Sequence, residues 1–275
     1  MNPFARFYVI CIAGVTLGPF VPLVIASFAF RWVWPDLLPS EWWWQVRGEL
    51  RRPVAWDYLF TPASGVLEAL YTTFLIALLA TLLAALLALP AARALATRDF
   101  RGKTAVELFL LTPLIIPELA VGLGILVLFL RLGLAGSLLG VVLAHLIPTL
   151  PYMTRILTSS FQTLDTELES QARTLGATPV QVFWRVTLPL LAPGLVAGML
   201  FSFLVSSNVF LLTFFVGRGS VETLPTLLFS QLSGGGVLDP VAAGLALLTS
   251  LPGIILLLFA ERFLSENVLL RGVGG

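Results

Sequence analysis

Few side chains in this 275-residue sequence have the type and setting that chemistry requires. Glu118 follows Pro117 inside one apolar run, His145 lies inside a second, and Ser206-Ser207-Asn208 interrupts a third. The sequence has no paired-carboxylate motif, no metal-ligand cluster and no nucleophile elbow, which excludes the common hydrolase and metalloenzyme sites. It also lacks G-x-x-x-x-G-K-[ST], so it does not bind ATP through a P-loop. We therefore expect no catalytic residue, metal or cofactor in this chain.

Polar side chains inside apolar runs indicate a different kind of site. At membrane depth such groups are costly, and they usually face a wet pathway or a partner group. His145 has an alternative role as a structural histidine, bonded to a backbone carbonyl that a following proline leaves free. The candidates for a translocation path are Glu118, His145, Ser206, Ser207 and Asn208.

The elements that must position these residues are membrane spans. The sequence is 58% hydrophobic and 11% charged, whereas soluble domains are about 45–50% apolar and about 25% charged. The net charge of +1 argues against a nucleic-acid partner. A span needs about 20 mostly apolar residues. Six stretches qualify, at 7–30, 67–92, 105–130, 134–159, 188–216 and 239–260, and they predict an all-α polytopic fold in one membrane domain over residues 1–275.

The distribution of Lys and Arg predicts the orientation of these spans. With the N-terminus inside, cytoplasmic segments hold ten of these residues and external segments hold six. Positive charge favours the cytoplasmic side, and the loop 93–103 alone holds four. We therefore expect both termini inside, a retained first span in place of a cleaved signal peptide, and external loops at 31–66 and 217–238. The tryptophans of 31–66 indicate either an aromatic belt at the lipid headgroups or a docking surface for a soluble partner.

Rows of small residues predict close helix packing. Ala77, Thr81 and Ala85 form one row, and Ala80, Ala84 and Ala88 form another. Gly136/Gly140 and Gly194/Gly198 each form a G-x-x-x-G, a spacing that lets helices approach closely in lipid. We expect a packed bundle within the chain or against a second subunit.

The segment 161–189 predicts two short helices on the cytoplasmic side. Asp165 or Thr166 can cap a helix that runs to Leu175, and Gly176 can end it. Thr178-Pro179-Val180-Gln181 has the pattern of a second helix start, with a capping box. The second helix then carries an apolar face. This face could lie on lipid headgroups or insert into a groove on a cytoplasmic protein.

The same segment resembles the EAA loop of ABC-importer permeases. Gly176 matches the glycine of that loop, and Val186, Leu188 and Pro189 match its Ile-x-Leu-Pro ending. Ser170-Gln171-Ala172 stand at the E-A-A position, so the leading acid is absent and Glu169 lies one residue early. The resemblance runs from about 67 to 260, through PLIIPELAVG and AHLIPTLPYMTRI. It indicates the metI-like family, nearest the polyamine, phosphonate and ferric-iron branch.

The resemblance implies a multi-subunit importer in a bacterial or archaeal cytoplasmic membrane. Two copies of a cytoplasmic ATPase, carrying ATP and Mg, would dock on 161–187. A second permease, identical or related, would complete the pore, and an external binding protein would deliver a small polar solute. In polyamine-type permeases an acidic pair stands where this chain has Asn208 and Val209, which weakens the case for a polyamine. The implied ATPase-coupling residues are Glu169, Ser170, Gln171, Ala172, Leu175, Gly176, Val180, Phe183, Trp184, Leu188 and Pro189.

Two other functions compete with this one. A stand-alone secondary transporter would use Glu118 and His145 as proton sites, but it predicts internal repeats, and the sequence has no convincing one. A structural membrane scaffold would explain neither the 161–189 helices nor an intramembrane glutamate. We therefore expect a permease subunit without enzymatic activity of its own.

Overall fold

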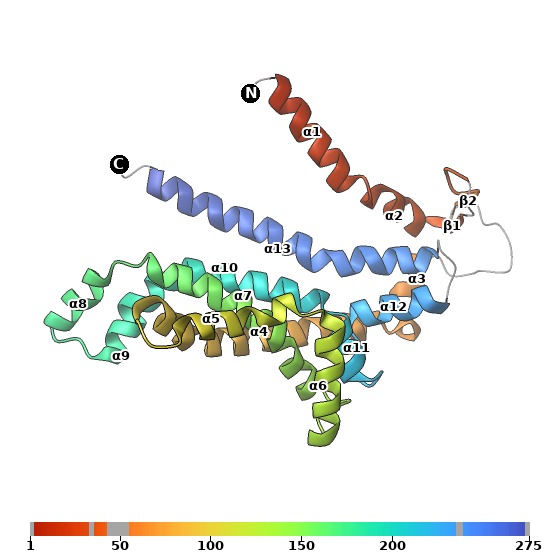
Figure 1. Ribbon diagram of the computed structural model, residues 1–275. Helices are drawn as coiled ribbons and strands as arrows, with labels where there is room; N and C mark the ends of the chain where they lie inside the picture. Colours follow the sequence, from red (N-terminus) through yellow and green to blue (C-terminus); the bar gives the residue numbers. More distant parts are fainter. Residues whose placement is uncertain (1–2, 33–35, 43–54, 235–238, 273–275) are drawn as a thin grey trace. The chain divides into compact units, whose positions relative to one another are not determined.

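The computed structural model describes residues 3–32, 36–42, 55–234 and 239–272, and within them the chain is mostly helical (Figure 1). The chain divides into two compact units, residues 1–71 with 222–252 and residues 72–221 with 253–275. In order the elements are α1 (Pro3–Leu17), α2 (Phe20–Ser27), β1 (Ala29–Arg31), β2 (Glu41–Trp42), α3 (Ala55–Leu59), η2 (Pro62–Ser64), α4 (Val66–Thr97), α5 (Lys103–Ile115), α6 (Glu118–Leu132), α7 (Leu138–Gln162), α8 (Thr166–Thr174), α9 (Pro179–Val182), η3 (Phe183–Thr187), α10 (Leu188–Asn208), α11 (Leu211–Gly217), α12 (Leu224–Gly234) and α13 (Pro240–Gly272).

The first unit contains 31–66 and residues 222–238, which are one predicted external loop and most of the other. In 31–66, β2 pairs antiparallel with β1, and α3 follows. Trp56 packs between Phe28 and Phe60, with ring centroids 6.1 and 6.3 Å away, so this tryptophan supports the core of the unit. Trp34, Trp43 and Trp44 lie outside the described residues. The segment 217–238 is not a simple loop, because it contains α12, whose Leu224 is fully buried.

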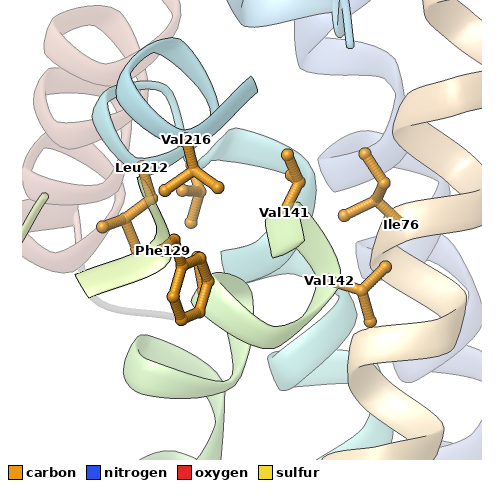
Figure 2. Packing of buried hydrophobic residues seen from close by; sticks show 8 residues of the cluster. Ile76, Phe129, Val141, Val142, Leu212 and Val216 are labelled. Carbon is orange, nitrogen blue, oxygen red and sulfur yellow. The ribbon is translucent and has the colours of Figure 1, made fainter. Parts of the chain in front are cut away.

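The second unit has two hydrophobic clusters. Figure 2 shows one of them, where Ile76 of α4, Phe129 of α6, Val141 and Val142 of α7, and Leu212 and Val216 of α11 meet. The other lies farther along α4 and α7 and is completed by Leu191 of α10. Together the two clusters hold α4, α7 and α10 side by side.

The small residues of the sequence explain how closely these helices pack. Ala80, Ala84 and Ala88 are fully buried along α4. On α10, a Cβ added to Gly194 would collide with Ser160 of α7, and one added to Gly198 would lie 2.8 Å from the Sδ of Met153. The predicted close packing at Gly194/Gly198 is therefore confirmed.

The pair Gly136/Gly140 has another role than the sequence predicts. Gly136 has a φ of +76° in the turn before α7, and a Cβ on Gly140 would meet the carbonyl of Leu134 in that same turn. These glycines therefore allow the turn between α6 and α7, and they do not form a helix-packing motif.

The predicted spans are helical, but three of them are interrupted, the first of these at residues 18–19 between α1 and α2. Among the described residues, Val66–Thr97, Leu138–Gln162 and Pro179–Asn208 are each long and apolar enough to cross a membrane. The third predicted span is α5 and α6, which meet at an angle of 102°. The apolar stretches Gly14–Ser27, from the end of α1 through α2, and Pro240–Leu256, the first part of α13, are shorter. The fifth stretch ends as α10 at Asn208 and resumes as α11.

The bend between α5 and α6 has a local cause. Ile116 precedes a proline and is extended, with φ −73° and ψ 135°, as proline requires of the residue before it. Pro117 then serves as the N-cap residue of α6. As a result α5 packs against α7 while α6 packs against α11.

Candidate functional site

The first helix of the 161–187 hairpin begins and ends as its sequence predicts. Asp165 caps α8 by accepting a hydrogen bond from the backbone N–H of Glu167 at 2.9 Å. At the other end Gly176 has a φ of +87°, and its N–H donates to the carbonyl of Arg173 at 2.9 Å. An L side chain adopts this backbone conformation only with strain.

The second helix of the hairpin is continuous with a membrane span. Thr178 and Gln181 form the full capping box at the start of α9, and Pro179 occupies the first position. At Phe183–Thr187 the helix widens into a π-helical turn, η3, and it then continues directly as α10. The hairpin is therefore connected to the fifth predicted span by continuous helix.

The hairpin exposes a row of large apolar side chains. Leu175 is 88% exposed, Val180 67% and Trp184 62%. Val182 points the other way and is buried, and Phe183 packs edge-on against Trp184 with centroids 5.5 Å apart. Exposed apolar residues of this size on a polar, capped hairpin are typical of a surface that a partner covers.

A polar network attaches the hairpin to the rest of the unit. Glu169 of α8 accepts from Arg93 of α4 at 2.8 Å and from the Thr187 hydroxyl, in η3, at 2.6 Å. Arg173 lies 3.9 Å from the same carboxylate. Glu169 thus joins α4, α8 and η3, and Ser170, which stands at the acidic position of the family pattern, only donates to the Glu167 carbonyl.

The remaining predicted coupling residues surround these contacts. Gln171 is exposed and Ala172 half-buried on α8, and their carbonyls accept from the N–H groups of Leu175 and Ala177 at the helix end. Leu188 and Pro189 form the start of α10. They lie where the π-helical turn joins the span, so the hairpin and the span meet at the motif that the sequence identified.

The structure gives His145 a structural setting. The ring is 1% exposed, its Nδ1 lies 2.8 Å from the Ser206 hydroxyl, and its Nε2 lies 2.8 Å from the Thr213 hydroxyl. Thr213 also donates to the Val209 carbonyl at 3.3 Å, so it accepts from Nε2–H, and Ser206 donates to Nδ1. His145 therefore links α7, α10 and α11 through two hydroxyls, and not through a freed carbonyl.

The other predicted path residues are more accessible or locally bonded. Glu118 is exposed as the first residue of α6, at the bend. Asn208 is exposed at the last residue of α10 and donates to the Leu204 carbonyl at 2.9 Å. Ser207 is buried and donates to the Phe203 carbonyl at 2.8 Å. His145 and Ser206 are in contact, while Glu118 and Asn208 stand at the ends of helices.

A polar cavity that the sequence did not identify lies between α5, α7 and α10. It has a volume of about 690 Å³, and Leu95 at the end of α4 also lines it. Thr154 is buried in its wall, and the Thr154 hydroxyl has no partner within the described residues. The polar lining comprises Glu107, Thr154, Arg155, Thr158, Ser159, Ser160 and Gln162.

Comparison with protein families adds an independent finding. Residues 80–266 match the family described as "Binding-protein-dependent transport system inner membrane component". The molybdenum transport system permease protein ModB of Mycobacterium tuberculosis is 33% identical over 257 residues, covering 86% of this chain and 85% of that protein. The putrescine transport system permease protein PotI of Escherichia coli is 33% identical over 142 residues, and the match spans half the length of each chain.

Solved structures show the same fold at low sequence identity. A bacterial ABC transporter involved in the import of the acidic polysaccharide alginate matches 95% of this chain and 98% of its own, with a TM-score of 0.71 and 15% identity. The MetNI methionine ABC transporter, in an inward-facing conformation, matches 72% of this chain and 95% of its own, with a TM-score of 0.56 and 16% identity.

Proposed function

Because the chain belongs to the family of inner membrane components of binding-protein-dependent transport systems, we propose that it is the permease subunit of an ATP-driven importer. The single observation that carries this function is the capped 161–187 hairpin, which presents Leu175, Val180 and Trp184 to solvent and continues into α10. The chain supplies half of a pore and carries no ATP site. ATP and Mg are held by a separate ATPase.

The ATPase binds the exposed apolar row of the hairpin. An amphipathic helix that places its apolar face in a groove is a common mode of recognition, and α8 and α9 present such a face on two short helices. Two ATPase copies serve one pair of permeases, which are either identical or related. An external binding protein delivers the solute to the opposite side of the membrane.

Movement of the hairpin reaches the pore along two connections. One is the covalent path from α9 through η3 into α10. The other is the ion pair between Glu169 and Arg93, which transmits movement of α8 to the end of α4. Charge-assisted hydrogen bonds of this length are about twice as strong as neutral ones, so the hairpin and the span ends move together.

The solute crosses near the contact of the third, fourth and fifth spans. The cavity between α5, α7 and α10 forms the inner part of the route, supported by Thr158, Ser159 and Ser160 in its lining. Glu118 and Asn208, both exposed, line the part beyond it, while His145 and Ser206 hold the helices in position. The proton-driven alternative is disfavoured because both nitrogens of His145 are occupied by hydroxyls in the core.

The solute is a small polar compound. The relatives reported above are named for two different solutes, putrescine and molybdenum, so the family alone does not choose between them. Asn208 adds no charge to the route, which weakens its attraction for a polycation. We infer six spans, with both termini and the hairpin in the cytoplasm, on the side of the ATPase.

Reconstitution with the ATPase and the binding protein tests this function. The complex in liposomes should take up solute only with ATP and the binding protein present. Leu175→Glu, which puts a charge on the apolar row, should remove ATPase binding and uptake together. Thr163→Glu adds the same charge at an exposed position between α7 and α8, outside the apolar row, and should leave both intact. Uptake without ATP, or equal activity of the two variants, would contradict the proposal.

A further inference from the structure

A cleft at the end of α4 gathers three guanidinium groups, more than the single carboxylate of Glu169 can pair. It has a volume of about 510 Å³, within the range of about 300–1,000 Å³ common for small-molecule sites. Arg93 and Arg98 come from the end of α4 and the residue after it, and Arg173 comes from α8. The complete lining is Pro90, Arg93, Ala94, Thr97, Arg98 and Arg173.

The neighbouring acids do not neutralise this cleft. One carboxylate, that of Glu169, serves both Arg93 at 2.8 Å and Arg173 at 3.9 Å. Asp99, which follows Arg98 in the sequence, pairs with Lys103 at 3.4 Å. Arg98 is exposed and forms no ion pair within the described part of the chain. The cleft therefore has an excess of positive charge and free N–H donors, which suit a phosphate group.

The surface leading to the cleft is apolar. Leu87, Pro90, Ala94 and Arg98 follow one another at helical spacing along α4 and the residue after it, so they share one side of this long apolar helix. Leu86 and Leu87 are 70% and 49% exposed, one turn before Pro90. An apolar strip that ends in three arginines matches a ligand with a hydrocarbon tail and an anionic head, and a free phosphate would leave the strip unused.

We propose that this cleft binds the phosphodiester headgroup of an anionic membrane lipid, with its acyl chains along Leu86 and Leu87. The inference rests on the membrane placement proposed above, and it is independent of solute and uptake. Basic pockets at the end of membrane helices on the cytoplasmic side are suited to such headgroups. Because Arg93 and Arg173 also pair with Glu169, the bound lipid lies directly beside the hairpin anchor.

Lipid retention by the permease–ATPase complex tests the proposal. The purified complex is exchanged into micelles with equal amounts of phosphatidylglycerol and phosphatidylcholine, and bound lipids are counted by native mass spectrometry. The wild-type complex should retain phosphatidylglycerol selectively. Arg98→Gln should lower this preference about 5-fold, and Arg98→Gln with Arg173→Gln about 30-fold. Arg101→Gln removes the same charge from an exposed residue outside the cleft and should retain wild-type preference.

Three results would overturn the proposal. Equal retention by Arg98→Gln and Arg101→Gln would show that the cleft has no special role. Displacement of phosphatidylglycerol by millimolar inorganic phosphate would identify a site for a free anion. Loss of the ATPase from the Arg98→Gln complex, with unchanged lipid retention, would identify the cluster as an ATPase contact. Arg98→Gln breaks no ion pair, so its fold should be intact, which size-exclusion chromatography verifies.

Discussion

Replacing Gly176 by Val should weaken ATPase binding through backbone strain alone. The residue has a φ of +87°, and no heavy atom lies within 4 Å of an added Cβ. The cost is therefore that of placing an L residue in the left-handed region, about 1–2 kcal/mol, and up to about 3 kcal/mol for a strained site. A cost of about 2 kcal/mol lowers the population of the hairpin conformation that the ATPase binds, and raises the apparent Kd about 30-fold.

Gly176→Asn separates strain from the presence of a side chain. Asn tolerates the left-handed conformation better than other residues that carry a Cβ, so this variant should bind within about 3-fold of wild type. The assay is titration of the ATPase onto the permease in lipid nanodiscs, followed by uptake measurements. Equal loss of affinity in the Val and Asn variants would refute the strain argument, because it would mean that the ATPase needs the space at position 176.

Three further predictions concern the network, the helix packing and the cavity. A double-mutant cycle with Glu169→Gln and Arg93→Gln, measured on the free energy of unfolding, should give a coupling energy of about 1–2 kcal/mol, because the ion pair is partly buried. A coupling energy below about 0.3 kcal/mol would mean that the two residues act independently. Gly194→Ala should lower the Tm by creating a clash with α7. Gly124→Ala should leave the Tm unchanged or raise it, because the added Cβ has no heavy atom within 4 Å. In a background without Cys11, Thr158→Cys should react with a water-soluble thiol reagent added from the cytoplasmic side, and failure to react in every state of the ATP cycle would place the route elsewhere.

Local chemistry made the hairpin predictable from sequence. Asp165, Gly176 and the Thr178–Gln181 capping box act within a few residues of the chain, so their pattern fixes where each helix begins and ends. The family membership was likewise visible in the glycine and the Leu-Pro that follow at fixed spacing. The alanine rows of α4 and the Gly194/Gly198 pair correctly predicted close packing, because only small residues allow it.

Contacts between distant parts of the chain were not predictable in the same way. Glu169 meets Arg93, 76 residues earlier, and the family pattern directed attention to the position of Ser170 instead. The hydroxyl partners of His145 come from two other helices, and nothing in the sequence pairs them. The bend at Pro117 had a visible signal in the proline, but the apolar run on both sides of it favoured one straight span. The cavity appears only once α5, α7 and α10 are placed together.

Site-directed cross-linking tests the central claim that the 161–187 hairpin is the ATPase docking element. In a background without Cys11, Leu175→Cys and Trp184→Cys are each paired with cysteines on the ATPase surface in the assembled complex. Both should form cross-links to one groove of the ATPase, with yields that change on ATP addition. Thr163→Cys, exposed between α7 and α8 and outside the apolar row, should give little. Efficient cross-linking from position 163 with none from 175 or 184 would contradict the account.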